Sequence, residues 1–168
     1  MFDKLIDVIR SLGVAILPFQ IVSEDRAAIL LRFGRFRNVV RPGLLWKFPF
    51  ADAVMSCDCR SHFYRTDEQS LITLDGEAVV VSCLMSFRVA CPKKAILSQT
   101  SFGQSVWDGT AATLSRLVSE TEFDGLKTDA FAAELMQRVV SENSEYGAEI
   151  LTCRLENLAR ARTYRIVK

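Results

Sequence analysis

The sequence predicts an α+β fold, and three observations along the chain support this class. Apolar residues recur at every second position in several stretches of the first half, which is the spacing of strands. From about residue 101 the apolar spacing changes to that of helices. Residues 149–156 then alternate once more. Strands followed by helices and a closing strand are typical of the α+β class.

Residues 1–22 are expected to form a membrane anchor. Residues 1–11 carry apolar side chains at helical spacing with charged residues mostly opposite, and an apolar run of eleven residues follows. That run is too short for a spanning helix, which needs about 20 residues. An interfacial or re-entrant segment is favoured, and an ordinary core helix and strand is the alternative. The predicted anchor residues are Phe2, Leu5, Ile6, Ile9, Leu12, Ile16, Leu17 and Phe19.

A strand, a turn and an apolar loop are expected next. Residues 23–33 alternate, with Phe33 on the apolar face, and a strand there would end at Gly34. After the Pro42-Gly43 turn, residues 44–50 are crowded with apolar and aromatic side chains, which indicates an interface if they are exposed. The alternative is that these rings fill the end of the sheet. The predicted membrane-binding residues of this loop are Leu44, Leu45, Trp46, Phe48 and Phe50.

Further strands and two helices follow. Residues 53–64 read as one strand, and Asp75-Gly76 predicts a hairpin whose return strand spans residues 77–89. One face of that strand is apolar and predicted to be core; the mixed face is expected to supply polar contact surface for assembly. A capping box at residues 101–104 starts a helix to about residue 121, and a second helix runs from about residue 128 to 146. Gly147 is its expected stop.

Composition and motifs argue against several classes of function. The net charge is +1 and the basic and acidic residues are interleaved, so nucleic acid is not an expected partner. The five cysteines lack zinc spacing and read as reduced thiols. There is no phosphate loop or catalytic motif, and His62 is the single histidine. We therefore expect no enzyme activity, no cofactor and no metal. Residues 159–168 form a basic tail that is either solvated or contacts anionic lipid or an acidic partner.

Five strings in order resemble the SPFH/band 7 family (stomatin/prohibitin/flotillin-like). They lie at residues 32–49, 73–89, 111–117, 145–151 and 154–158, and include Arg32-Phe33-Gly34-Arg35, Thr73-Leu74-Asp75-Gly76 and Glu145-Tyr146-Gly147. The resemblance covers about residues 23–158 and implies a twisted antiparallel sheet packed by helices. Family members are membrane-bound scaffolds that assemble into rings or cages and regulate channels or membrane proteases.

The resemblance implies a membrane-associated scaffold or adaptor that oligomerises and organises or regulates a membrane protein. The expected partners are membrane lipid, further copies or an SPFH-family partner, and a membrane protease or channel. A monotopic placement with the domain on the cytoplasmic side is expected. Family members usually continue into a long charged helix or coiled coil, and this sequence ends about ten residues after the last predicted strand. The alternative function is that of a truncated mimic that binds and modulates a full-length family complex.

Overall fold

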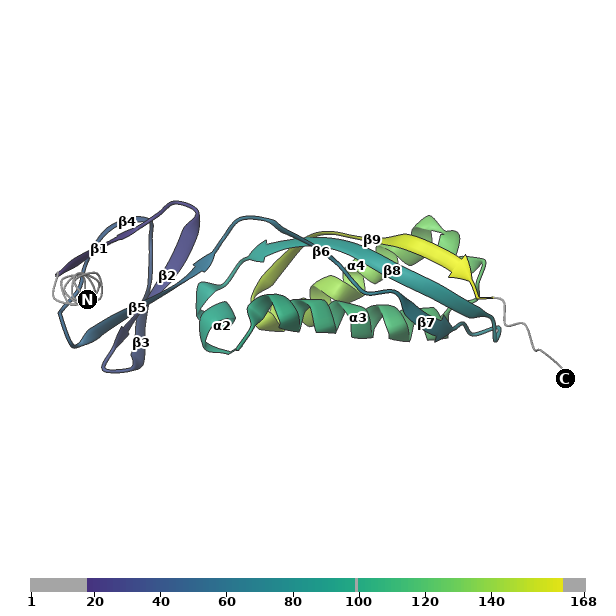
Figure 1. Cartoon of the computed structure of the whole chain (residues 1–168), viewed down its shortest axis with the longest axis horizontal. Helices are drawn as coiled ribbons and strands as arrows, with labels where there is room; N and C mark the ends of the chain where they lie inside the picture. The colour runs from purple at the N-terminus through teal and green to yellow at the C-terminus, as the bar shows by residue number, and fades with distance from the viewer. Residues whose placement is uncertain (1–17, 99, 162–168) are drawn as a thin grey trace, which may run out of the picture. The chain divides into compact units, whose positions relative to one another are not determined.

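The computed structural model describes residues 18–98 and 100–161. Antiparallel sheets and helices confirm the α+β class (Figure 1). The described strands form three sheets, which differs from the single sheet that the resemblance implies. The chain divides into two compact units, residues 1–60 (unit 1) and residues 61–168 (unit 2). The helix of the expected anchor falls outside the described residues, and the domain bounds predicted from the sequence stay a prediction.

Unit 1 contains two small antiparallel sheets. Strands β1 (Phe19–Val22) and β4 (Gly43–Trp46) pair as a two-stranded ribbon. The second sheet has the order β3 (Arg35–Val40), β2 (Arg26–Arg32), β5 (Asp52–Asp58). Because β2 is central, its middle residues are buried on both faces. The core of unit 1 consists of Val22, Ala28, Leu30 and Val40, with Leu45 and Val54 packed against it.

The strand predicted at residues 53–64 is interrupted. Strand β5 ends at Asp58, and β6 (His62–Arg65) belongs to another sheet. The side chain of Asp58 accepts a hydrogen bond from the backbone N–H of Arg60 at 2.8 Å, which is a local turn that competes with extended pairing. The alternation of residue types continues across this turn, so periodicity alone does not reveal it.

Unit 2 is a sheet covered on one face by helices (Figure 1). Strand β8 (Ala78–Val89) is central: β6 and β7 (Gln69–Ile72) pair along one edge, and β9 (Ala148–Arg160) along the other. The helices are α2 (Pro92–Leu97), α3 (Phe102–Glu120) and α4 (Asp129–Asn143), with short 3-10 turns η1 (Gly125–Lys127) and η2 (Ser144–Tyr146). The predicted core face of β8 is confirmed: Val79, Val81, Cys83, Met85 and Phe87 are buried against α3 and α4.

Two details of unit 2 contradict the sequence-based expectations. No capping box forms at residues 101–104: Ser101 makes no side-chain cap bond, and Gln104 donates to Asp108 at 3.0 Å instead. Polar contact surface was also expected on the mixed face of β8 near Ser82, Ser86 and Arg88; the two serines are buried, whereas Arg88 is exposed. As the central strand, β8 has neighbours on both edges, and the Ser86 hydroxyl lies 2.8 Å from that of Thr152 on β9.

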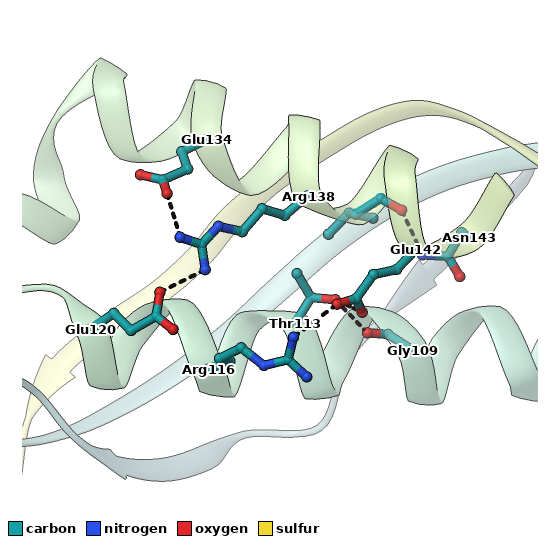
Figure 2. A network of polar contacts seen from close by, with 9 residues as sticks. Gly109, Thr113, Arg116, Glu120, Glu134, Arg138, Glu142 and Asn143 are labelled. Carbon is teal, nitrogen blue, oxygen red and sulfur yellow. Dashed lines mark hydrogen bonds and ion pairs between the residues drawn. The ribbon is translucent and has the colours of Figure 1, made fainter. Parts of the chain in front are cut away.

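A network of polar contacts joins α3 to α4 (Figure 2). Arg138 of α4 donates to Glu120 of α3 and to Glu134, each at 2.6 Å. The Thr113 hydroxyl of α3 lies 2.5 Å from Glu142 of α4. Together with the buried apolar contacts, these bonds hold the two helices side by side on the sheet.

Gly147 ends the second helical region as predicted. Its φ of +82° is favourable only for glycine, and a Cβ there would lie 2.9 Å from the Cβ of Lys94 and 3.0 Å from the carbonyl oxygen of Cys91. Gly76 in the β7–β8 turn has nearly the same φ, +81°, but nothing within 4 Å of its Cβ position. A side chain at either position would be strained by the positive φ, but only at Gly147 would it also overlap neighbouring atoms.

Replacing Gly147 with alanine is expected to lower the free energy of unfolding by about 2 kcal/mol or more, since strain and overlap add. Gly76→Ala is the matched control and is expected to cost only the strain, about 1 kcal/mol. Chemical denaturation of both variants measures the difference. Equal losses would contradict the tight approach of residues 91–94 to Gly147.

Candidate functional site

Unit 1 exposes large apolar side chains on one face of the β1–β4 ribbon. Phe19 pairs with Trp46, and Ile21 pairs with Leu44. Because side chains alternate along a strand, these four lie on the same face, and all four are exposed. The opposite face carries Val22 and Leu45 into the core. The ribbon is therefore apolar on both faces, although only one of them is covered.

Two turns place further rings next to the end of this ribbon. The N–H of Phe33, after β2, donates to the carbonyl oxygen of Ala51, before β5, at 2.8 Å. Phe33 and Phe50 are 80% and 92% exposed. The N–H of Lys47, next to Trp46, donates to the carbonyl oxygen of Pro18 at 2.7 Å, which keeps the ribbon beside the second turn. We call this surface the aromatic end; it consists of Phe19, Phe33, Trp46, Phe48 and Phe50.

The backbone under two of these rings is strained. Phe33 has φ +48° and Phe50 has φ +68°, in the left-handed region that bulky side chains avoid. Such a conformation costs on the order of 1–3 kcal/mol per residue and persists only where surrounding contacts impose it. Neither ring recovers this cost by burial, because both are exposed. Backbone strain and nearly full exposure therefore coincide at these two rings.

Asp52 holds residues next to both strained positions. Its carboxylate accepts two hydrogen bonds from Arg32, at 2.6 and 2.8 Å, and one from the N–H of Phe48 at 2.9 Å. The guanidinium of Arg32 also lies over the ring of Phe48, 4.9 Å from its centroid. The bond from Arg32 and then that from Phe48 lower the pKa of Asp52 to about 2. A charged carboxylate thus ties both turns to the strands.

The structure brings together part of the predicted membrane-binding set. Phe19, Leu44, Trp46, Phe48 and Phe50 are exposed, so these rings do not fill the end of the sheet; Leu45 packs into the core. Whether they bind a membrane stays a prediction. The other predicted residues lie outside the described part of the chain: Phe2, Leu5, Ile6, Ile9, Leu12, Ile16 and Leu17.

Sequence reasoning missed Ile21 and Phe33. Ile21 belongs to the apolar run before residue 23, and its pairing with Leu44 could be inferred only from the ribbon. Phe33 was expected on the apolar face of a strand. In the structure β2 ends one residue earlier, at Arg32, and the positive φ turns the Phe33 ring into solvent.

Other candidate chemistry is sparse. Across residues 18–98 and 100–161 no helix has both the length and the apolar character that crossing a bilayer requires. In that same part of the chain no group of three His, Cys, Asp or Glu side chains could hold a metal ion. His62 stands 6.0 Å from the ring of Phe87. The five cysteines are free, and burial raises the pKa of Cys57 to about 11, so this thiol stays protonated at neutral pH.

Comparison with known proteins places the sequence in a family. The sequence profile described as SPFH domain / Band 7 family matches residues 20–165. An uncharacterized protein of Methanothermobacter thermautotrophicus is 22% identical over 160 residues, which is 94% of this chain and 50% of that protein. Protein HflK of Haemophilus influenzae is 26% identical over 146 residues, 85% of this chain and 34% of HflK.

Two further relatives bear informative names. A stomatin homolog of Pyrococcus horikoshii is 23% identical over 141 residues, 83% of this chain and 53% of the homolog. The protein named modulator of FtsH protease HflK in Escherichia coli is 28% identical over 111 residues, 66% of this chain and 26% of that protein. The chain thus spans about half or less of the length of these relatives.

Proposed function

Because the chain belongs to the SPFH domain / Band 7 family, we propose that it is a membrane-associated scaffold that docks on a lipid surface through the aromatic end of unit 1. The observation that carries this proposal is the display of Phe33 and Phe50 on strained backbone, almost wholly in solvent. Trp46 and Phe48 add rings of the kind that favour the headgroup level of a bilayer. Membership of a family with stomatin and HflK relatives supports a scaffold without enzyme activity.

The mechanism is physical. Moving an exposed apolar side chain from water into the membrane interface contributes up to about 1.5–3 kcal/mol, so a few of these rings suffice for stable partitioning. Strand β1 begins at Phe19, so residues 1–17, the rest of the expected anchor, join the chain at the aromatic end. Docking there would set the orientation of unit 1 on the cytoplasmic face of the membrane.

Self-association and a membrane-protein partner complete the proposal. Residues 101–146, which include α3 and α4, hold eight acidic and three basic residues, whereas residues 18–60 of unit 1 hold seven basic and four acidic ones. A basic surface of one copy and an acidic surface of the next are complementary, which favours contacts between unlike faces of neighbouring copies. A relative is named a modulator of the FtsH protease, so a membrane protease is the partner class we propose.

Flotation with liposomes tests the docking. Trp46→Ala and Phe50→Ala are each expected to reduce the bound fraction about tenfold, with little change in melting temperature, since both rings are exposed. Phe63→Ala is the matched control, because Phe63 is a 73% exposed ring of unit 2. Equal losses in all three variants would contradict docking through unit 1.

The same bound fraction tests the scaffold. Crosslinking it should yield species beyond the dimer. A monomer that co-purifies with a longer family member would instead support the mimic, and would overturn self-association.

A further inference from the structure

The end of the β2–β3 hairpin carries two arginines directly opposite each other. Arg32 and Arg35 are cross-strand partners, and like charges in that position are destabilising. Asp52 neutralises only Arg32, and its oxygens are taken by Arg32 and by the N–H of Phe48. Arg35 is exposed and has no ion pair among the described residues. One positive charge is therefore left over beside Phe33.

Two more cations are close in sequence to residues of the aromatic end. Arg37 is exposed two residues further along β3, and Lys47 lies between Trp46 and Phe48, with its ammonium group 3.5 Å from Gln20. We call Arg35, Arg37 and Lys47 the basic rim. The rim borders the aromatic end from both turns.

The acidic residues of unit 1 are elsewhere. Among residues 18–60, all carboxylates except Asp52 lie around the opposite end of β2. They are Glu24, Asp25 and Asp58, and Asp58 is the register partner of Arg26. The opposite end of β2 thus holds three carboxylates beside Arg26, Arg41 and Arg60. Among residues 18–60, Asp52 is the one carboxylate at the end that exposes the rings, where it faces Arg32 and the three cations of the basic rim.

We propose that the basic rim binds the phosphate groups of anionic phospholipids in a bilayer. The proposal rests on the docking proposed above and names the lipid class that docking prefers. When the rings enter the interface, the rim comes to the level of the headgroups, where each cation gains from the negative surface potential. Arginine suits this role because its planar fork can bind two phosphate oxygens at once. The local repulsion between Arg32 and Arg35 is relieved by the bound anion.

Two kinds of vesicle test the rim with the full chain. One consists of phosphatidylcholine alone, and in the other part of the phosphatidylcholine is replaced by phosphatidylglycerol. The protein is expected to bind the anionic vesicles more tightly, and Arg35→Gln is expected to weaken that binding about fivefold. The same variant should bind neutral vesicles unchanged. Arg35→Lys should retain most of the preference because it keeps the charge.

The matched control is Arg154→Gln, which removes an exposed arginine of unit 2 and should change neither binding constant. Inorganic phosphate at the same ionic strength as a chloride control should not compete, since the site needs the bilayer. Equal weakening of Arg35→Gln on both vesicles, or competition by phosphate, would overturn the lipid site. If the wild type binds anionic vesicles but does not bind neutral ones, docking through the rings is wrong. The proposal that the basic rim binds anionic lipid would remain supported.

Discussion

Replacing Asp52 with asparagine is expected to disorder the aromatic end and abolish most membrane binding. Asparagine is uncharged, so Arg32 loses its bidentate partner, and its repulsion with Arg35 across the β2–β3 pair is no longer offset. The strained turns at Phe33 and Phe50 then lose a contact that holds the residues next to them. Removing the charge of Asp52 should therefore change the conformation at Phe33 and Phe50, although its side chain bonds to neither residue.

Tryptophan fluorescence and liposome flotation measure this effect. The chain has two tryptophans, so a Trp107→Phe background makes Trp46 the reporter of unit 1. Glu149→Gln is the control, because it breaks an exposed Arg88–Glu149 pair of unit 2, and such surface pairs contribute little. An Asp52→Asn variant with native Trp46 emission and native binding would show that the Arg32–Asp52 ion pair is dispensable.

The same carboxylate predicts an acid dependence. Its pKa is lowered to about 2 in the folded protein, below the ordinary value of about 3.9. The ionised form therefore stabilises the fold at pH values above the ordinary pKa, and this contribution is lost as the pH falls from about 4 toward 2. Unit 1 of the wild type should lose stability over that window more steeply than Asp52→Asn. Identical profiles would mean that Asp52 is not the group that titrates.

Short-range patterns determine much of unit 2, and the sequence predicted it well. The alternation along β8, the Asp75-Gly76 turn and the stop at Gly147 each depend on neighbours a few residues away, and the structure confirms all three. The exposure expected for Ser82 and Ser86 was wrong, because it depends on pairing with β9, whose residues are far away in sequence; Arg88 of the same face is exposed. The periodicity of apolar residues identifies a strand, but it does not show which distant strand pairs with it.

The candidate site shows the same limit. The apolar segment at residues 44–50 was singled out from composition, but whether its rings are exposed or fill the end of the sheet was left open. In the structure Trp46, Phe48 and Phe50 are exposed, and residues 44–46 belong to strand β4. The Arg32–Asp52 ion pair was not predicted, because the two residues are twenty positions apart and a salt bridge leaves no local pattern in the sequence. The positive φ of two phenylalanines was equally hidden, since glycine is the residue that normally marks such a turn.

Replacing Phe33 and Phe50 together with asparagine is expected to separate stability from binding. Asparagine tolerates positive φ far better than phenylalanine, so the folded state should lose strain and gain up to about 1 kcal/mol per site. Almost no apolar burial is lost in exchange, because both rings are exposed. Membrane binding should fall by about a hundredfold or more, since two interfacial rings are replaced by polar side chains.

Chemical denaturation of the double variant measures its free energy of unfolding, and liposome flotation measures its membrane binding. Phe63→Asn is the control: its ring is exposed on β6 with ordinary strand geometry, so this change relieves no strain and should leave binding intact. A destabilised double variant would mean that the rings support the fold of unit 1, and its weaker binding would then follow from unfolding. A more stable protein that no longer binds would show that the two rings serve membrane binding and not the stability of unit 1.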